Sequence, residues 1–316
     1  MSDDIRYDSA HTVLAADRYR RSRGLWRLLA FAALAIAVLA IAGRFALIDA
    51  PGPGDRIARI EINGPIATSQ ARFEAIEDLM DDEAVRAVIV SINSPGGTTA
   101  GGEEIYEALL RLQEVKPVVS VINELGASAA YMSAIGTERI YARRLSIVGS
   151  IGVLYQHVDA GKLLDTIGID FDKIASGPLK AEPDIDEPLV GAPRDSLARL
   201  VNDSFEWFVD IVAERRGFER SRALELSDGR VVTGRMAEAA GLIDALGGER
   251  EAQLWLEEQR EVDADLPIVT AYPKPQEGFG WFSDMVVREA RSAIGISPDG
   301  PVVLDGLVSL WQVEQR

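Results

Sequence analysis

Short apolar runs alternate with stretches of helical periodicity along most of this chain. Residues 56–62 (RIARIEI), 87–92 (AVIVSI) and 118–122 (VVSVI) are rich in β-branched side chains and predict strands. Residues 70–80 and 100–113 between them place apolar side chains at helical spacing. This alternation of strands and helices predicts an α/β fold with a largely parallel sheet.

The same patterns predict further elements beyond this first part. A helix is expected to begin near Ala127 and to run through residues 131–135. Further strands are expected at residues 139–142, 151–155 and 170–175, and long surface helices at residues 197–216 and 249–260. Residues 261–280 contain Pro and Gly and predict irregular structure, whereas 281–293 have the spacing of a helix packed on its own or a neighbouring subunit.

A long apolar stretch near the N-terminus predicts a membrane anchor. Residues 28–43 (LLAFAALAIAVLAIAG) carry no charge, and a helix over 25–48 could cross about 30 Å of hydrocarbon. A cleaved signal peptide is the alternative, although its apolar part is usually shorter. The positive-inside rule places the N-terminus in the cytoplasm and the rest in the periplasm of a bacterial cell, because five arginines precede the stretch: Arg18, Arg20, Arg21, Arg23 and Arg27.

These features divide the chain into five parts. They are a cytoplasmic tail (1–24), a transmembrane anchor (25–48), a linker (49–55), an α/β domain (56–260) and a C-terminal extension (261–316).

Composition narrows the chemistry that is open to the domain. The net charge of −17 argues against nucleic acid as a partner, and the absence of Cys excludes a thiol nucleophile and a thiolate metal site. There are two histidines, and the predicted topology leaves His11 on the cytoplasmic side. His157 is therefore the single imidazole expected in the domain, and no metal or cofactor is predicted.

A glycine turn follows the predicted strand 87–92. In Asn-Ser-Pro-Gly-Gly-Thr (93–98), Gly96 and Gly97 would let backbone N–H groups approach a ligand closely. An oxyanion hole is one interpretation and phosphate binding is another, although the Walker lysine and the Rossmann spacing are both absent. An ordinary strand-to-helix turn is the third.

A serine surrounded by small residues follows the predicted strand 118–122. Ser128 lies in Glu-Leu-Gly-Ala-Ser-Ala-Ala-Tyr-Met (124–132), where a helix should begin and its free N–H groups would stabilise developing negative charge. Ser128 is a candidate nucleophile, and an N-cap serine is the structural alternative.

The base that would activate this serine could be His157 or Lys180. Lys180 lies in the turn-rich loop Ala-Ser-Gly-Pro-Leu-Lys-Ala-Glu-Pro (175–183). A lysine base requires its pKa to fall from about 10.4 toward about 7, which burial in an apolar groove can achieve. Ser150, in Gly-Ser-Ile-Gly-Val (149–153), could hold the neutral amine, or could belong to a turn that starts a strand.

Taken in order, these segments resemble the short, single-domain form of the bacterial signal peptide peptidase A family. The shared elements are the N-terminal anchor, SPGG, the small-residue block around Ser128, VGSIGV, the SGxxK loop and GRVVTGRMAEAAGLIDALGG (229–248), over roughly residues 55–250. The resemblance implies a ClpP/crotonase-like spiral of βαβ units and a Ser–Lys dyad.

Carried over to this chain, the resemblance implies Ser128 as nucleophile, Lys180 as base and Ser150 as the hydroxyl that orients the lysine. Gly96 and Gly97 match the oxyanion turn, to which the N–H of Ala129 is added. It also implies a ring-shaped homo-oligomer in which the Ser and Lys of one site can come from neighbouring subunits. The implied substrates are cleaved signal peptides and other extended hydrophobic chains.

One departure from the family pattern keeps other functions open. The family usually has AASGGY around the serine, whereas this chain has GASAAY (126–131), so Ala129 and Ala130 add methyl groups that are expected to narrow the groove. The competing functions are a ClpP-like Ser–His protease using His157, a non-catalytic membrane scaffold of the same fold, and a crotonase-like acyl-CoA enzyme. The acyl-CoA enzyme fits poorly with a domain outside the cytoplasm, because CoA substrates are scarce there.

Overall fold

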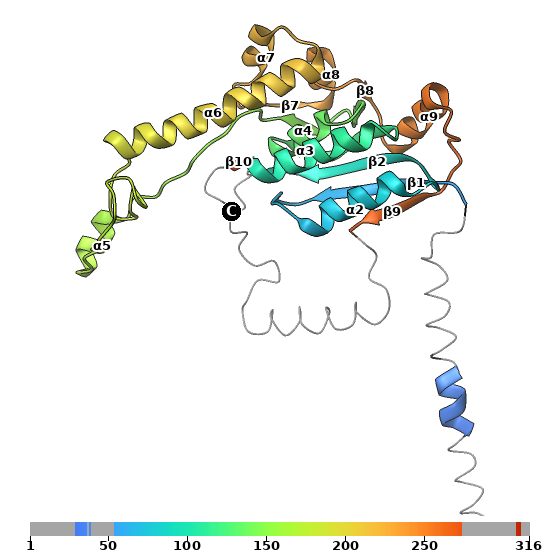
Figure 1. Ribbon diagram of the computed structural model, residues 1–316, viewed down its shortest axis with the longest axis horizontal. Helices are drawn as coiled ribbons and strands as arrows, with labels where there is room; N and C mark the ends of the chain where they lie inside the picture. Colours follow the sequence, from blue (N-terminus) through green and yellow to red (C-terminus); the bar gives the residue numbers. More distant parts are fainter. Residues whose placement is uncertain (1–28, 37, 39–53, 274–307, 311–316) are drawn as a thin grey trace, which may run out of the picture. The chain divides into compact units, whose positions relative to one another are not determined.

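A computed structural model describes residues 29–36, 38 and 54–273, and the backbone of 308–310 (Figure 1). The chain divides into two compact units, residues 1–52 with 276–296, and 53–275 with 297–316. In the first unit, the described residues 29–36 and 38 are helical. No helix among the described residues has the length and apolarity needed to cross a membrane, and most of the anchor predicted at 25–48 lies outside them.

The second unit is built on an eight-stranded sheet and a separate two-stranded sheet of β3 and β10, and its helices lie mainly between the strands in sequence. The strands are β1 (Arg56–Asn63), β2 (Val85–Ser94), β3 (Gly96–Thr98), β4 (Val118–Ala127), β5 (Arg139–Ala142), β6 (Ile147–Gly149), β7 (Val231–Thr233), β8 (Ala245–Leu246), β9 (Ile268–Tyr272) and β10 (Val308–Leu310). The helices are α2 (Gln70–Asp81), α3 (Thr99–Gln113), α4 (Ala129–Ile135), α5 (Gly161–Ile167), α6 (Gly191–Arg216), α7 (Arg220–Leu226), α8 (Gly234–Ala240) and α9 (Glu249–Arg260).

Most strand pairs in the large sheet are parallel. The order is β7-β6-β4-β2-β1-β9, with β5 beside β4 and β8 beside β5, and only β6 and β7 run antiparallel to each other. Parallel neighbours need a crossover, which α2 and α3 supply between the first central strands. The predicted α/β fold with a largely parallel sheet is confirmed.

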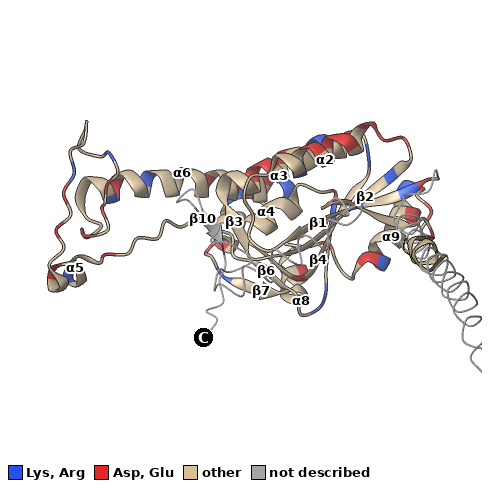
Figure 2. Ribbon diagram, turned by 90° about the horizontal axis from the view of Figure 1, so that it is seen from below, with Lys and Arg blue, Asp and Glu red and all other residues tan. Residues whose placement is uncertain are grey.

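Both faces of this sheet are covered, which explains the nearly continuous apolar strands. Ile57, Ile89 and Val119 face a cluster that includes Leu256 of α9. The opposite face of the sheet packs into the larger core, which contains residues of α2, α3, α4 and α6, among them the fully buried Leu109. Figure 2 shows acidic residues along α2 and α3.

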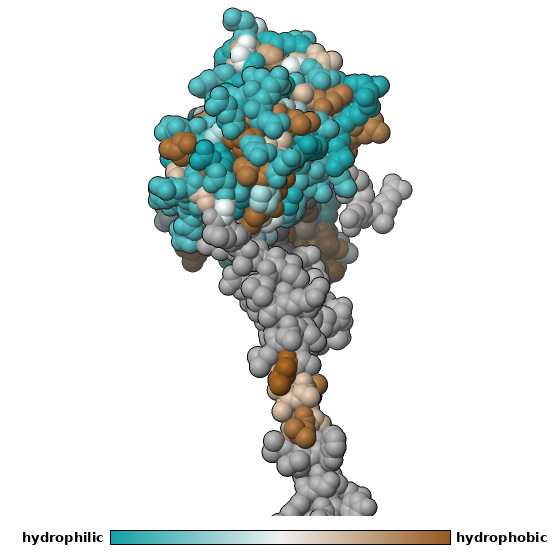
Figure 3. Space-filling model, turned by 90° about the vertical axis from the view of Figure 1, so that its right-hand side faces the viewer, coloured by the Kyte–Doolittle hydropathy of each residue, from teal (hydrophilic) through white to brown (hydrophobic). Residues whose placement is uncertain are grey.

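The outer surface of this body, which we define as residues 54–153 and 207–273, is largely polar. The face seen in Figure 3 is mostly hydrophilic, with small separate apolar areas. Helices α2 and α3 begin with side-chain caps: Ser69 Oγ accepts the N–H of Arg72 at 3.3 Å, and Thr98 Oγ1 accepts that of Gly101 at 2.9 Å.

A second region extends from the body and has little interior of its own. We call residues 154–206 the arm; it comprises α5, the loops on either side and the first half of α6. None of its residues is buried, whereas α6 buries Phe208, Val209, Ile211 and Val212 in its second half. Figure 1 shows α5 and the start of α6 at the end away from α4.

Several predicted elements are confirmed and some are wrong. The strands and helices predicted between 56 and 142 occur with ends shifted by a few residues, and the helix at 249–260 is confirmed. The strands predicted at 151–155 and 170–175 are absent, and β6 lies at Ile147–Gly149 instead. The irregular region predicted at 261–280 contains β9, and the helix predicted at 281–293 lies outside the described residues.

Candidate active site

Three of the predicted site segments meet at one edge of the sheet. Gly96 follows β2, Ser128 follows β4 and Ser150 follows β6, and these three strands are parallel neighbours. Their carboxyl ends are level, because Ser94 pairs with Gly126 and Ala127 pairs with Gly149. The carboxyl edge of an open parallel sheet is where α/β proteins commonly bind ligands.

Ser128 has a backbone conformation that is rare for residues with a side chain. Its φ is 60° and its ψ is −122°, and the residue is 1% exposed. Such strain costs about 1–3 kcal/mol and occurs preferentially at functional sites. Ser128 occupies the N-cap position of α4, as the structural alternative expected, but its side chain makes no cap hydrogen bond to the helix. A serine on a sharp strand-to-helix turn is the geometry of a hydrolase nucleophile.

Ser150 lies beside this serine on the next strand end. The N–H of Ser128 donates to the carbonyl of Gly149 at 2.7 Å, and the N–H of Ser150 donates to the carbonyl of Arg230 at 2.7 Å. Gly149 and Ser150 both have positive φ, 104° and 51°. These two residues turn the chain out of β6, and Ser150 stays 9% exposed next to the nucleophile turn.

Gly97 lies in β3, and one edge of that strand is fixed by Ile66. The N–H of Ile66 donates to Gly96 O and the N–H of Thr98 donates to Ile66 O, both at 2.8 Å. A Cβ on Gly97 would lie 1.8 Å from the carbonyl oxygen of Ile66, so the position admits only glycine. Because backbone groups alternate along a strand, the N–H and C=O of Gly97 point to the opposite edge of β3.

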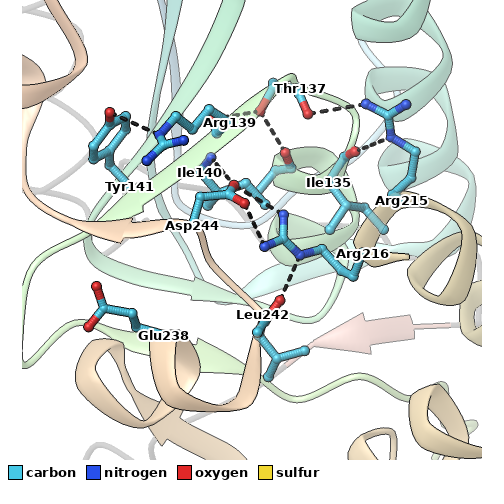
Figure 4. Close-up of polar contacts among 12 residues, drawn as sticks. Ile135, Thr137, Arg139, Ile140, Tyr141, Arg215, Arg216, Glu238, Leu242 and Asp244 are labelled. Atoms are coloured by element: carbon cyan, nitrogen blue, oxygen red, sulfur yellow. Dashed lines mark hydrogen bonds and ion pairs between the residues drawn. The ribbon is translucent and has the colours of Figure 1, made fainter. Parts of the chain in front are cut away.

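Helix α4, which follows Ser128, is anchored by hydrogen bonds from other elements (Figure 4). The fully buried Tyr131 donates its hydroxyl to Leu242 O at 2.7 Å, and burial raises its pKa well above the usual range. Arg215 Nε donates to Ile135 O at 2.8 Å, and Arg216 pairs with Asp244 at 2.8 Å. The bonds of Tyr131 and Ile135 tie α4 to other elements, whereas the Arg216–Asp244 pair contacts β5, because Asp244 also accepts the N–H of Ile140.

The two alanines that depart from the family pattern are fully buried. Ala129 and Ala130 both have 0% exposure. A Cβ built on Gly102 of α3 would lie 3.0 Å from the Cβ of Ala129, so that methyl group faces α3. The expectation that the Ala129 methyl narrows a groove is therefore wrong, because it packs into the interior between α3 and α4.

Lys180 is in the arm and is exposed, whereas Ser128 is buried in the body. Backbone hydrogen bonds in this region join arm residues to other arm residues. Lys180 N donates to Gly177 O at 3.1 Å, and Ala160 N donates to Ile185 O at 2.7 Å. Within one chain, the structure thus brings Gly96, Gly97, Ser128, Ala129 and Ser150 together but leaves Lys180 on a separate part of the molecule.

Two other lysines are occupied elsewhere. Lys173 Nζ pairs with Asp184 at 2.6 Å and Glu182 at 2.8 Å, and these carboxylates raise its pKa. Burial lowers the pKa of Lys116, but its Nζ donates to Asp82 O and Val85 O. Val85 begins β2, so Lys116 is at the amino edge of the sheet, opposite Ser128.

His157, the alternative base, also lies in the arm. Its Nε2 is 2.8 Å from the carbonyl oxygen of Glu187, a contact within the arm. The described residues contain no group of three or more His, Asp or Glu side chains arranged to hold a metal ion.

Sequence reasoning missed two features of this site. One is Ile66, which fixes β3, and the other is the anchoring of α4 by Arg215. An isolated isoleucine or arginine gives no sequence signal of its own. The strained turn had an indirect signal, because small residues flank Ser128 on both sides.

Comparisons with known proteins agree with this geometry. The family model for peptidase family S49 matches residues 111–263, a range that contains Ser128, Ser150 and Lys180. The chain is 36% identical over 212 residues to a protein of Synechocystis sp. assigned as a protease, covering 66% of this chain and 76% of that protein.

Two more distant relatives also carry the name of a protease or peptidase. The chain is 26% identical over 197 residues to the chloroplast serine protease SPPA of Arabidopsis thaliana (61% and 28% covered). It is also 26% identical over 164 residues to a protein of Enterococcus faecium assigned as a signal peptide peptidase SppA (51% and 47% covered). The chain thus spans less than half the length of these two relatives.

Among solved structures, a ClpP1 N165D mutant from Listeria monocytogenes matches 61% of this chain and 92% of its own, with a TM-score of 0.41 and 16% identity. The ClpP/crotonase-like spiral that the resemblance implied stays a prediction. The strained serine at the carboxyl edge of the sheet and the extent of the match to the Synechocystis protein lead to one conclusion: the chain belongs to peptidase family S49 and is a serine protease.

Proposed function

We propose that this protein is a membrane-anchored endopeptidase that uses Ser128 and Lys180 to cleave extended hydrophobic peptides, including released signal peptides. The observation that carries the proposal is the buried, strained Ser128 beside Gly97, whose N–H points away from Ile66. The Enterococcus relative assigned as a signal peptide peptidase supports this substrate class.

The chemistry follows from these positions. Ser128 Oγ attacks the peptide carbonyl while a neutral Lys180 amine accepts the hydroxyl proton. The N–H groups of Gly97 and Ala129 stabilise the oxyanion. Lys180 then protonates the leaving amine, and water activated by the same lysine releases the acyl group from Ser128. The hydroxyl of Ser150 orients the lysine amine by hydrogen bonding.

A second copy of the chain supplies the lysine in this proposal. The arm presents large apolar side chains to solvent, including Val158 (64% exposed), Leu163 (63%), Phe171 (58%) and Ile174 (103%). Exposed apolar surface of this extent is typical of subunit interfaces. Docking the arm on the body of a neighbour would bury these side chains and bring Lys180 into an apolar environment that favours its neutral form.

Repeating this contact head to tail closes a ring of subunits. The anchor proposed at residues 25–48 would hold the ring on the inner membrane with its active sites in the periplasm. That location gives access to signal peptides released from the membrane.

Substitution in the full chain tests the dyad. Ser128→Ala and Lys180→Ala should each reduce cleavage of a hydrophobic peptide at least about 10³-fold, since removing one member of a catalytic unit disables the unit. Lys162→Ala is the matched control, because Lys162 is also an exposed lysine of the arm. It should cleave at the wild-type rate.

The alternative Ser–His protease makes the opposite prediction. His157→Ala should keep the wild-type rate if Lys180 is the base. An inactive His157→Ala variant together with an active Lys180→Ala variant would overturn the Ser–Lys proposal and favour His157 as the base.

A further inference from the structure

A partly buried ion pair holds the chain just after Ile66, the residue that fixes β3. Arg72, in the first turn of α2, is 7% exposed, and its Nη2 donates to Glu104 Oε1 of α3 at 2.7 Å. The same Nη2 donates to the carbonyl of Ala67 at 2.7 Å. Glu104 also accepts the N–H of Ser69 at 3.1 Å. The two side chains thus bind the backbone between Ile66 and α2 at two points.

This backbone is linked directly to β3. Ile66 donates its N–H to Gly96 O and accepts the N–H of Thr98, both at 2.8 Å. These two residues flank Gly97, the proposed oxyanion donor. Since Ile66 and Ala67 share a peptide bond, which is planar and stiff, a displacement of Ala67 is passed on to Ile66 and from there to Gly97.

Helix α3 leaves the same segment little freedom to move. A Cβ on Gly101 would lie 2.8 Å from the carbonyl carbon of Ala67 and 2.9 Å from its Cα, so the two backbones are in close contact. Thr98 Oγ1 accepts the N–H of Gly101 at 2.9 Å and joins the end of β3 to the same turn of α3. The segment therefore contacts α3 directly and α2 through Arg72.

The ion pair contributes geometry more than stability. Arg72 Nε is buried and has no hydrogen-bond partner among the described residues. A buried donor without a partner is costly, and a buried ion pair commonly adds little net stability over an apolar replacement. A guanidinium does supply a planar group with donors in fixed directions. Here it joins the carbonyl of Ala67 to the carboxylate of Glu104.

We infer that Arg72 and Glu104 are positioning residues for the oxyanion hole, because they hold Ile66, which in turn holds Gly97. The inference rests on the role of the Gly97 N–H in the proposed function. An oxyanion donor acts mainly on the transition state, and misplacing a group by about 1 Å can slow a reaction 10²-fold. Loss of the ion pair should therefore lower kcat and leave KM nearly unchanged.

Arg72→Met in the full chain tests the inference, with Arg56→Met as the matched control. Arg56 pairs with Asp82 at the amino edge of the sheet, and its side chain is 16% exposed against 8% for Arg72. We expect Arg72→Met to lower kcat about 10- to 100-fold and Arg56→Met to keep the wild-type kcat, both assayed below their melting temperatures. Equal kcat values for the two variants would overturn the inference.

Two substitutions of Glu104 give a second measurement, which also serves if Arg72→Met does not fold. Glu104→Gln keeps an oxygen that accepts the N–H of Ser69, whereas Glu104→Ala removes it. Glu104→Ala should lower kcat about tenfold or more, and Glu104→Gln should restore it to within about threefold of the wild type, both at nearly constant KM. A wild-type kcat for Glu104→Ala would contradict the inference.

Hydrogen exchange separates this inference from the proposed function. The amides of Ile66 and Thr98 should exchange faster in Arg72→Met than in Arg56→Met. Equal exchange would overturn the link between the ion pair and β3. Faster exchange with a wild-type kcat would overturn the role of Gly97 as oxyanion donor. Neither result depends on the base, so an active Lys180→Ala variant would refute the proposed dyad and leave this test intact.

Discussion

The body and the arm belong to one chain but differ in how many of their side chains are buried. In the body, buried apolar clusters cover both faces of a largely parallel sheet, and α4 belongs to the larger of these clusters. This interior holds Ser128 in a strained conformation. The arm buries no residue. It exposes several large apolar side chains, of which Ile174 is fully exposed to solvent. The difference teaches that folding alone organises the nucleophile, whereas the proposed base would be organised by the subunit contact that we propose.

The largest expected effect sharpens this contrast with one leucine from each region. Leu109→Ala removes a fully buried side chain and should reduce the free energy of unfolding by about 2–5 kcal/mol. Leu163→Ala, at 63% exposed, should change it by less than about 0.5 kcal/mol. Chemical denaturation of the two variants at low protein concentration provides the measurement. A similar loss for Leu163→Ala would mean that the arm is packed within one chain.

The ion pair that anchors the segment after α4 is the next test. Arg216→Met leaves Asp244 and the carbonyl of Gly241 without their guanidinium partner, and should cost about 1–3 kcal/mol because these groups are partly buried. Arg220→Met is the matched control, since Arg220 pairs with Asp210 and Glu206 at the surface and should cost less than about 1 kcal/mol. Equal costs in thermal denaturation would contradict an anchoring role.

An acidic residue placed on the arm should break assembly without unfolding the body. Ile174→Asp should lower peptidase activity about tenfold or more at low protein concentration, because a charge at a desolvated interface is costly. Its melting temperature should stay unchanged. Val115→Asp is the control, as Val115 is 60% exposed at the turn before β4 and lies outside the arm. Sedimentation should show smaller particles for Ile174→Asp only, and equal behaviour would argue against the arm as an interface.

The smallest expected effect is a pH-dependent change in the stability of the body. Glu251 accepts the N–H of Gly248 at 2.7 Å at the start of α9, and this backbone hydrogen bond lowers the pKa of its carboxyl group. A depressed folded pKa stabilises the protein above the unfolded value near pH 4.3, and the gain disappears as the pH falls through the folded pKa. Glu251→Gln should therefore lower the melting temperature slightly at pH 7 and leave it unchanged at pH 3. A constant difference at both pH values would contradict this origin.

The sequence predicted the body well and the arm poorly, for physical reasons. Strands β2 and β4 are long and mostly apolar because they are buried on both faces, and such runs are readable without knowing the fold. The predicted strand at 151–155 fails because Gly149 and Ser150, both at positive φ, turn the chain away after β6. Short edge strands such as β8 carry too few residues to show a pattern.

The candidate site divides in the same way. The serine and the glycine turn could be located from sequence, because small residues mark places where backbone approaches a ligand. The strain at Ser128 and the fixing of β3 by Ile66 depend on tertiary contacts, which no local pattern encodes. The role of Lys180 follows from the family resemblance and from its exposed place on the arm, and stays a prediction.

In the proposed mechanism, Ser128 of one subunit works with Lys180 of another. Mixing two inactive variants tests this pairing most directly. Ser128→Ala and Lys180→Ala proteins, each inactive alone, would be dissociated together and reassembled at equal amounts. If the dyad is shared head to tail, about a quarter of the sites combine an intact serine with an intact lysine, so about a quarter of the wild-type rate should return. If each chain completes its own site, the mixture stays inactive, and that result would contradict the account.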